Sequence, residues 1–406
     1  MVFVLIITLL FSIYLISKVT SNRNFIFLPL VVIIAPLVGL IYFDFIYNLG
    51  NQFGFEVKQS SIIFSIFNEI SIHYIFSILI FSLTYFLIRK IYPLKNKKEF
   101  VKIPKLGICI TIFAILNLSK IFLNFINVSI YFRLLISNAA FLSLVLLFVS
   151  LFINLKINKL AIWKLIILTL FIIVFIFSLT FDKGVILTPV ISSLIILLAT
   201  GNLNFNFSFL KQVLSIISIS FLLPILNFIE FFFFKSSARS FVRLTEAMET
   251  SVVTNFFFIA YSPTCNLDIN LSIIEILFAP IKSLLGGDID FYSNKLMEIC
   301  FPFESLDGAG RGFGLINEAY LSKELPIPIY FTLISILFIL IFEYFYSRST
   351  LFGLLIFSQA PGIIYKLIRS ESINTVFKVS YLIMAAYLVN LLIIILSRYF
   401  YQNNNS

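Results

Sequence analysis

The sequence predicts an all-α integral membrane protein, a polytopic bundle of about eleven transmembrane helices with one large loop outside the membrane. Two observations support this fold class. Of the 406 residues, 60% are hydrophobic and only 12% are charged, and the mean hydropathy is +1.07, far outside the range of soluble globular proteins. The hydrophobic residues also form continuous runs, and a helix that crosses a bilayer needs roughly 20 mostly apolar residues.

Eleven apolar runs are predicted to be membrane helices, in chain order 2–17, 25–47, 67–89, 106–126, 131–153, 161–181, 184–200, 212–234, 325–346, 350–368 and 376–397. The first run has no basic residues before it and no small-residue cleavage site after it, so we expect a retained span rather than a signal sequence. The runs divide the chain into residues 1–234 with helices one to eight, the loop 235–323, which is expected to be helical, and residues 324–406 with helices nine to eleven and a short cytoplasmic tail.

The basic residues predict how the helices are oriented. Short connections rich in Lys and Arg stay on the cytoplasmic side of a membrane. The richest such connection has one acid and seven bases, namely Arg89, Lys90, Lys95, Lys97, Lys98, Lys102 and Lys105. Alternating spans then place the N-terminus and the loop 235–323 outside and the C-terminus in the cytoplasm. The net charge of +10 is therefore interpreted as topology and attraction to anionic lipid, not as nucleic-acid binding.

The loop 235–323 contains much of the charge of the chain, with 10 of its 19 acidic and 7 of its 29 basic residues. Chemistry on a polar substrate needs fixed charges that face water, and the bilayer core tolerates few of them. If the protein is an enzyme, its active site is expected in this loop and the helix ends around it. The only histidine is His73, no Cys or His cluster has metal-ligand spacing, and no ATP-binding sequence occurs, so no cofactor or metal is expected.

The first candidate segment of the loop carries two arginines, Arg239 and Arg243, after a pair of serines that suggest a helix start. A helix would place both guanidiniums on one face because they are four residues apart. Such a pair is suited to phosphate or diphosphate oxygens. The alternative is a solvated helix on which Arg243 pairs with Glu246 or Glu249.

The second candidate segment runs from Asp307 to Tyr320 and has four glycines within seven residues. Glycines let backbone amides approach an anion closely, and Arg311 lies among them. Glu318 stands at the start of an apolar helical stretch. The alternative is a flexible loop between two helices, with Glu318 placed at a helix start because of the helix dipole.

The third candidate segment is the short connection after the tenth span, where Arg369 lies near Glu371. Lys366 in the same region is interpreted as an interfacial anchor, because Lys and Arg near span ends extend to the headgroups. Arg369 has the same alternative, but its position in a very short loop makes it a further candidate.

These segments resemble parts of a known family. The segment Gly310–Tyr320 (GRGFGLINEAY) followed by a span, the later outward connection that begins Ile368-Arg369-Ser370, and the hairpin Asp182-Lys183-Gly184 are similar to bacterial polysaccharide repeat-unit polymerases, the Wzy-type O-antigen polymerases, which are related to the O-antigen ligases. The resemblance covers the whole chain in architecture but only these stretches in residues.

The resemblance implies a glycosyltransferase of the bacterial inner membrane, whose large loop is periplasmic. Such enzymes join oligosaccharide repeat units carried on undecaprenyl diphosphate into O-antigen or capsular polysaccharide. It implies candidate roles for Arg311, Glu318 and Arg369, and we add Arg239 and Arg243 as loop arginines that bind diphosphate or glycan. The expected partners are the lipid-linked oligosaccharide, membrane lipid and a protein that regulates chain length.

The general base that takes the proton of the acceptor hydroxyl is predicted to be a carboxylate near this site. Glu318 is the first choice and Glu246 the second. Two other functions remain open. One is a lipid-linked oligosaccharide flippase or other transporter, which usually shows internal repeats. The other is an O-antigen ligase, although the family of ligases relies on a loop histidine and this loop has none.

Overall fold

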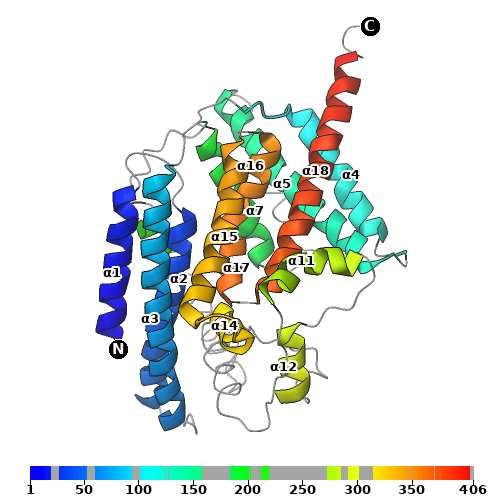
Figure 1. Ribbon diagram of the computed structural model, residues 1–406. Helices are drawn as coiled ribbons and strands as arrows, with labels where there is room; N and C mark the ends of the chain where they lie inside the picture. The colour runs from blue at the N-terminus through cyan, green and yellow to red at the C-terminus, as the bar shows by residue number, and fades with distance from the viewer. Residues whose placement is uncertain are drawn as a thin grey trace. The chain divides into compact units, whose positions relative to one another are not determined.

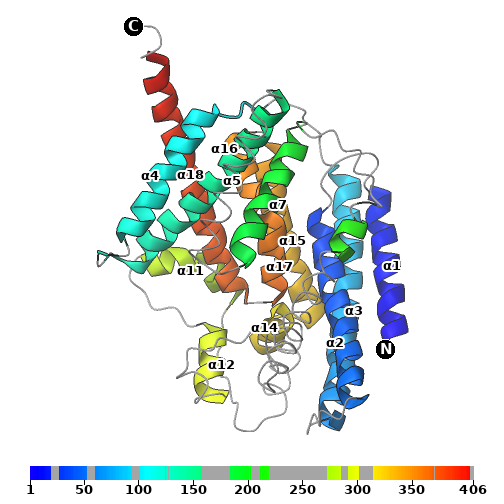
Figure 2. The ribbon, with the colours of Figure 1, turned by 180° about the vertical axis from the view of Figure 1, so that it is seen from behind.

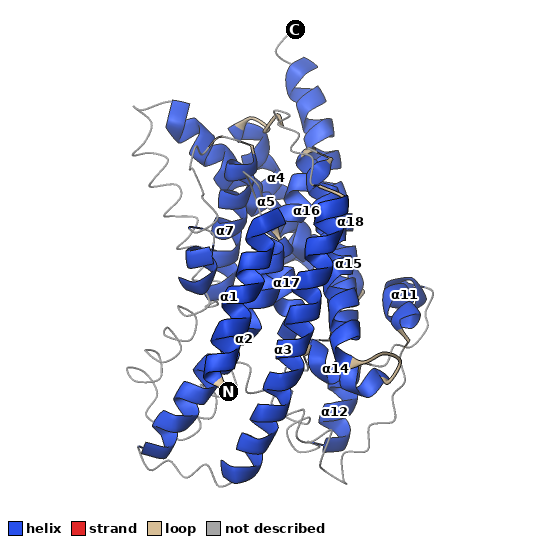
Figure 3. Ribbon diagram, turned by 60° about the vertical axis from the view of Figure 1, so that its left-hand side comes forward, coloured by secondary structure: helices blue, strands red, loops and turns tan. Residues whose placement is uncertain are grey.

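The computed structural model describes most of the chain, and every regular element in the described part is an α-helix (Figure 3). The described residues are 1–19, 27–52, 60–93, 101–123, 125–126, 128–157, 183–200, 202, 211, 213–218, 272–284, 291–300, 314–348, 350–369 and 371–402. The helices are α1 (Val2–Val19), α2 (Phe27–Gln52), α3 (Ser60–Ile91), α4 (Leu106–Leu123), α5 (Ile130–Ile157), α7 (Lys183–Ala199), α11 (Ile273–Leu284), α12 (Tyr292–Cys300), α14 (Leu315–Ser322), α15 (Ile327–Ser347), α16 (Leu351–Ser358), α17 (Ala360–Arg369) and α18 (Ser372–Gln402).

The predicted all-helical membrane class is confirmed, because seven helical stretches of the described residues are long and apolar enough to cross a membrane. These are Val2–Val19, Phe67–Ile91, Leu106–Leu123, Ile130–Asn154, Ile327–Ser347, Leu351–Ile368 and Ser372–Tyr399. Two shorter apolar stretches lie within α2 and α7. The predicted span 161–181 and most of 212–234, apart from residues 213–218, lie outside the described residues. The count of eleven spans and their orientation stay predictions.

The contacts within the chain divide it into two compact units. Unit 1 consists of Met1–Leu94, Phe207–Ile339 and Ile363–Phe377, and unit 2 consists of Lys95–Asn206, Leu340–Gly362 and Lys378–Ser406. The helices α15, α17 and α18 contribute residues to both. The whole of the predicted loop 235–323 belongs to unit 1, so its described helices share a unit with α1, α2 and α3 rather than forming a unit of their own.

In unit 1 the helices α1, α2 and α3 pack against one another, and Figure 1 shows α1 beside α3. Small hydroxyl side chains allow close approach of membrane helices. Three such side chains are fully buried here, namely Ser12 of α1 and Ser71 and Ser77 of α3. The ring of Tyr74 of α3 also meets the ring of Phe331 of α15 edge to face, with centroids 6.2 Å apart. These contacts hold the first turns of α15 against the α1–α3 group.

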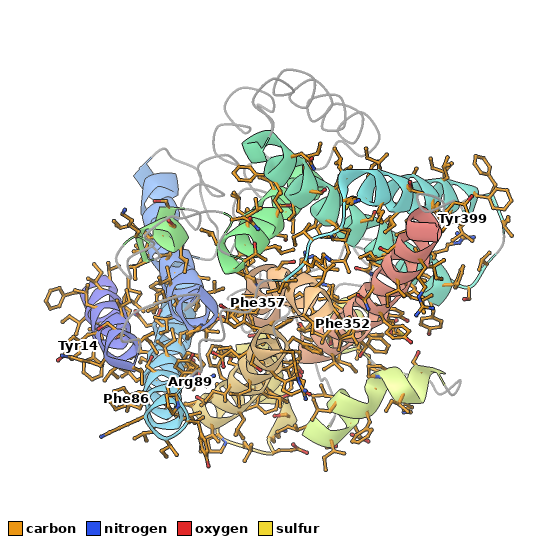
Figure 4. The ribbon with its side chains drawn as sticks, turned by 90° about the horizontal axis from the view of Figure 1, so that it is seen from above. Tyr14, Phe86, Arg89, Phe352, Phe357 and Tyr399 are labelled. Atoms are coloured by element: carbon orange, nitrogen blue, oxygen red, sulfur yellow. The ribbon has the colours of Figure 1, made fainter. Side chains whose placement is uncertain are left out.

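In unit 2 the helix α5 packs between α4 and α7, and α7 also contacts α16, as Figure 2 shows. Aromatic side chains fill the hairpin between α15 and α16. Phe352 of α16 meets Phe345 of α15 with ring centroids 5.9 Å apart, and Phe357 meets Tyr346 at 4.7 Å (Figure 4). The hairpin is also tight in its backbone, because a Cβ atom at Gly353 would lie only 2.2 Å from the carbonyl oxygen of Phe345.

The predicted span 350–368 is correct in extent but is two helices rather than one. Thr350 caps the start of α16, since its hydroxyl oxygen accepts a hydrogen bond from the backbone N–H of Gly353 at 3.1 Å. The helix α16 ends at Ser358, and Pro361 follows in the first turn of α17. Proline has no N–H and its ring clashes with the carbonyl four residues earlier, so the helix breaks between Ser358 and Pro361.

Candidate functional site

The short helix α14 begins in the glycine-rich segment that the sequence singled out. Gly314, at its N-cap, has φ 77° and ψ 143°, a conformation that side-chain-bearing L residues rarely adopt. Glycine is therefore required at this one described position of the run. The helix ends at Ser322, and the C-cap residue Lys323 has a left-handed φ of 53°. Nearly every side chain of α14 is buried, so this stretch is part of the core of unit 1 rather than a solvated loop.

Glu318 is the central residue of α14, and its carboxylate is fully buried. One carboxylate oxygen, Oε2, accepts a hydrogen bond from the backbone N–H of Ser372 at 2.7 Å. The other, Oε1, accepts bonds from the hydroxyl of Tyr330 at 2.9 Å and from the hydroxyl of Ser372. Charge-assisted hydrogen bonds of this kind are about twice as strong as neutral ones. Three donors from two other elements therefore hold one carboxylate.

These contacts have opposing effects on the protonation of Glu318. The pKa of Glu318 is raised from 4.5 to about 7 in total, chiefly because burial disfavours the charged form. The hydrogen bonds from Ser372 and Tyr330 lower this pKa, and the nearby carboxylate of Glu371 raises it. Near neutral pH the protonated and the charged form of Glu318 are therefore both populated. The hydroxyls of Ser372 and Tyr330 can either donate or accept, so they suit both protonation states.

The partner of Glu318 lies at the connection between α17 and α18. The helix α17 ends at Arg369 and α18 begins at Ser372, so only residues 370 and 371 join them. The helix α18 begins four residues before the predicted span 376–397, which lies within it. The reason is that the first N–H groups of a helix need acceptors, and Glu318 supplies one from 54 residues away. A carboxylate there also interacts favourably with the helix dipole.

Glu371 completes this helix start. It is fully buried, and its Oε1 accepts a hydrogen bond from the side-chain amide of Asn374 at 2.8 Å. Ser372 is also fully buried. Two carboxylates, Glu318 and Glu371, thus lie at the N-terminus of α18, which fits the rule that acidic groups stabilise this end of a helix.

The structure brings together two of the three segments that the sequence singled out. Glu318 from the second segment binds Ser372, which follows Arg369 of the third by three residues. The backbone of Arg369 ends α17, and its side chain is outside the described part. Arg239, Arg243, Glu246 and Arg311 also lie outside the described residues, so their predicted roles stay predictions.

Sequence reasoning missed Ser372 and Tyr330 as partners of Glu318. Tyr330 lies in the first turns of an apolar span, where a tyrosine is typical of the membrane interface. The sequence offered a stronger signal for Ser372, since a serine after an acid and before an apolar run is typical of a helix start.

Comparisons of the chain with protein-family models, with curated proteins and with solved structures found no match. The geometry of the Glu318 site therefore carries the functional argument.

Proposed function

We propose that this protein polymerises lipid-linked oligosaccharide repeat units into O-antigen or capsular polysaccharide at the periplasmic face of the bacterial inner membrane. The observation that carries the proposal is the contact between Glu318 and Ser372. It joins the GRGFGLINEAY segment to the connection that follows Arg369, and these are two stretches that resemble the polymerase family. A buried carboxylate with a pKa of about 7 fits acid–base chemistry at that junction.

The proposed reaction is a glycosyl transfer. A hydroxyl of the incoming unit forms a bond to the anomeric carbon at the carrier-linked end of the growing chain. The bond from that carbon to the diphosphate oxygen breaks, and undecaprenyl diphosphate leaves with the bonding electrons. Guanidinium groups stabilise the charge that builds on this leaving group without a metal, which is the role proposed for Arg311 and Arg369, with Arg239 and Arg243 as further candidates. The proton of the hydroxyl goes to a carboxylate.

Glu318 has two proposed roles in this reaction, which differ in whether it meets the substrate. As the general base it accepts the proton of the acceptor hydroxyl, and Glu246 is the second choice for this role. Glu318, Ser372 and Tyr330 are all buried, so the base role requires the junction to open when an acceptor binds. As a positioning residue, Glu318 instead fixes the connection that carries Arg369. Its pKa of about 7 favours the first role, and its burial favours the second.

A transporter of lipid-linked oligosaccharides is the second candidate function. The observation that favours it is the break between α16 and α17 inside the apolar stretch Leu351–Ile368, where Ser358 and Gln359 are buried. Interrupted membrane helices often line the binding sites of transporters. Polymerisation and transport predict different products, so one experiment separates them.

The test uses the full-length protein in lipid vesicles with purified lipid-linked repeat units. A polymerase makes a ladder of glycan chains and releases undecaprenyl diphosphate, and Glu318→Ala abolishes both. The matched control is Glu298→Gln, which changes an exposed carboxylate of α12 and leaves the ladder intact. Movement of unmodified repeat units across the vesicle membrane, with no ladder, would instead identify a transporter. Transfer of glycan to a lipid A core with no ladder would identify a ligase.

A further inference from the structure

The helix α11, within the predicted hydrophilic loop, has a well-defined start. The hydroxyl oxygen of Ser272 accepts a hydrogen bond from the backbone N–H of Glu275 at 3.1 Å, and the carboxylate of Glu275 accepts one from the backbone N–H of Ser272 at 2.9 Å. This reciprocal pair is a capping box, which satisfies two backbone donors that the helix itself cannot. The side chains of α11 are therefore held on a stable helical frame.

The two faces of α11 differ in what covers them. One face carries the buried residues Ile276, Ala279 and Pro280. A second face carries Ile274, Phe278 and Ile281, which are 68%, 58% and 53% exposed. Their spacing of four and then three residues places them in one stripe along the helix. We call these three residues the α11 stripe. Glu275 and Lys282 are exposed along one edge of it.

The position of α11 along the spans is fixed by its first residue. The backbone N–H of Ile273 donates a hydrogen bond to the carboxylate of Glu324 at 3.3 Å. Glu324 lies three residues before Ile327, where the membrane-crossing stretch of α15 begins. The start of α11 is therefore at the level where a span of the same unit enters the bilayer. Figures 1 and 2 show α11 lying across the direction of α15 rather than along it.

We propose that α11 is an interfacial helix whose stripe of Ile274, Phe278 and Ile281 is inserted among the lipids at the bilayer surface. An amphipathic helix that lies in the membrane plane buries its apolar face at the boundary between headgroups and acyl chains. The ammonium group of Lys282, on the edge of the stripe, matches the phosphate of the headgroups. Without lipid contact, the three large apolar side chains of the stripe would be exposed to water. An exposed apolar patch of this kind is typical of a surface that binds a membrane or another protein.

We expect lipid, rather than another protein, to cover the α11 stripe because a membrane span of the same unit begins beside this helix. Seven membrane-crossing stretches anchor the described chain in lipid, and one of them begins beside the start of α11. The large exposed side chains of the spans themselves, such as Leu333 of α15 at 49%, have the same lipid-facing character. The proposal concerns membrane contact alone and does not depend on the proposed glycosyl transfer.

The test measures the depth of single tryptophans in the full-length protein, reconstituted in phosphatidylcholine vesicles. Trp163→Phe first removes the only tryptophan of the chain. Phe278→Trp then reports the stripe, Leu333→Trp reports the bilayer interior and Glu298→Trp reports an exposed charged position of α12. Phospholipids brominated near the headgroup or deep in the acyl chain quench from the lipid, and acrylamide quenches from water.

The shallow brominated lipid is expected to quench Phe278→Trp about threefold more efficiently than it quenches Glu298→Trp, because an interfacial helix is buried only ~5–10 Å into the bilayer. Leu333→Trp should respond best to the deep brominated lipid. Acrylamide quenching of Phe278→Trp as strong as that of Glu298→Trp, with no effect of either lipid, would place the stripe in water and overturn the proposal. Shielding from both quenchers would mean that protein covers it, and would overturn the proposal equally. Ile274→Trp repeats the measurement should Phe278→Trp fail to fold.

Discussion

The contacts between distant segments inside unit 1 differ in kind from those inside unit 2. In unit 1, carboxylates bind backbone N–H groups of distant segments, as Glu318 binds Ser372 and Glu324 binds Ile273. In unit 2, two hydrogen bonds between distant segments are donated by serine hydroxyls to carbonyl oxygens, from Ser193 to Val145 and from Ser150 to Pro104. Neutral hydroxyls with aromatic packing are what membrane helices ordinarily use to associate.

This difference indicates that the contacts of the two units have different roles. A buried carboxylate is expensive, and it is kept only where its donors and its function offset the cost of desolvation. Unit 2 also buries a carboxylate, that of Glu343, but its contacts described above are made by neutral groups. We infer that substitutions at the carboxylate contacts of unit 1 change activity as well as stability, whereas those at the packing contacts of unit 2 change stability alone. The following substitutions test this contrast.

The largest effect is expected at Glu318. Glu318→Gln keeps an oxygen that can accept the N–H of Ser372 but cannot take up a proton near neutral pH. If Glu318 is the general base, glycan chain formation falls by about 100-fold or more. The measurement is the rate of chain elongation by purified protein in vesicles, with Glu298→Gln as the exposed control. Substantial activity in Glu318→Gln together with none in Glu318→Ala would show that Glu318 positions the junction instead.

The next effect is expected in unit 2 and concerns stability. Gly353→Ala places a Cβ atom 2.2 Å from the carbonyl oxygen of Phe345, a backbone atom that cannot easily move. Overpacking of this kind costs about 1–3 kcal/mol. The thermal unfolding midpoint in detergent should fall clearly, whereas activity per folded molecule stays near that of the native protein. Gly107→Ala, on α4 of the same unit, is the control because nothing lies within 4 Å of its Cβ position. Equal midpoints for the two variants would contradict the tight α15–α16 hairpin.

The sequence predicted the long helices well because hydropathy depends only on local composition. The six predicted spans that correspond to α1, α3, α4, α5, α15 and α18 all lie within or overlap single helices that meet the criteria of length and hydropathy. Pro361 indicates a break in the helix, but the apolar residues on both sides of it favour one continuous span, which is what the sequence analysis predicted. The loop 235–323 was predicted to be helical, but the bounds of α11 within it were not predicted. The signature of α11, Ser272 followed three residues later by Glu275, lies in a segment treated as one hydrophilic loop.

The site could be predicted only in part. Glu318 and the Arg369 connection each stood out as charges next to spans, but nothing in the sequence shows that they meet. The hydrogen bond between Glu318 and Ser372 joins residues 54 positions apart, and only the folded chain brings them together. The same contact explains why α18 begins before its apolar run does. Sequence reasoning placed Glu318 at the start of an apolar helical stretch of the outward loop, and the structure places it in α14 with its side chain fully buried.

A smaller effect is expected on the pH dependence of activity. A general base must be deprotonated, so the rate should rise with pH through about 7, the pKa of Glu318. The Tyr330 hydroxyl lowers this pKa and the Glu371 carboxylate raises it. Tyr330→Phe should therefore move the acid limb of the rate profile to higher pH, and Glu371→Gln should move it to lower pH. The measurement is the elongation rate of each variant from pH 5 to pH 9, a range of ~2 units on either side of the limb. Shifts in the same direction would mean that the limb does not report Glu318.

The smallest effect is expected at Ser193 in unit 2. Its hydroxyl donates to the carbonyl oxygen of Val145 on α5 at 3.1 Å and to that of Pro189 in its own helix at 2.7 Å. Interhelical hydrogen bonds in membranes contribute on average about 0.6 kcal/mol, so Ser193→Ala should barely lower the unfolding midpoint. Ser372→Ala makes the same chemical change in unit 1, but it removes a donor to a buried carboxylate, which contributes about 1.5–3 kcal/mol. If Ser193→Ala lowered stability or activity as much as Ser372→Ala does, the contrast between the two units would be wrong, because a neutral packing contact would then matter as much as the donor to Glu318.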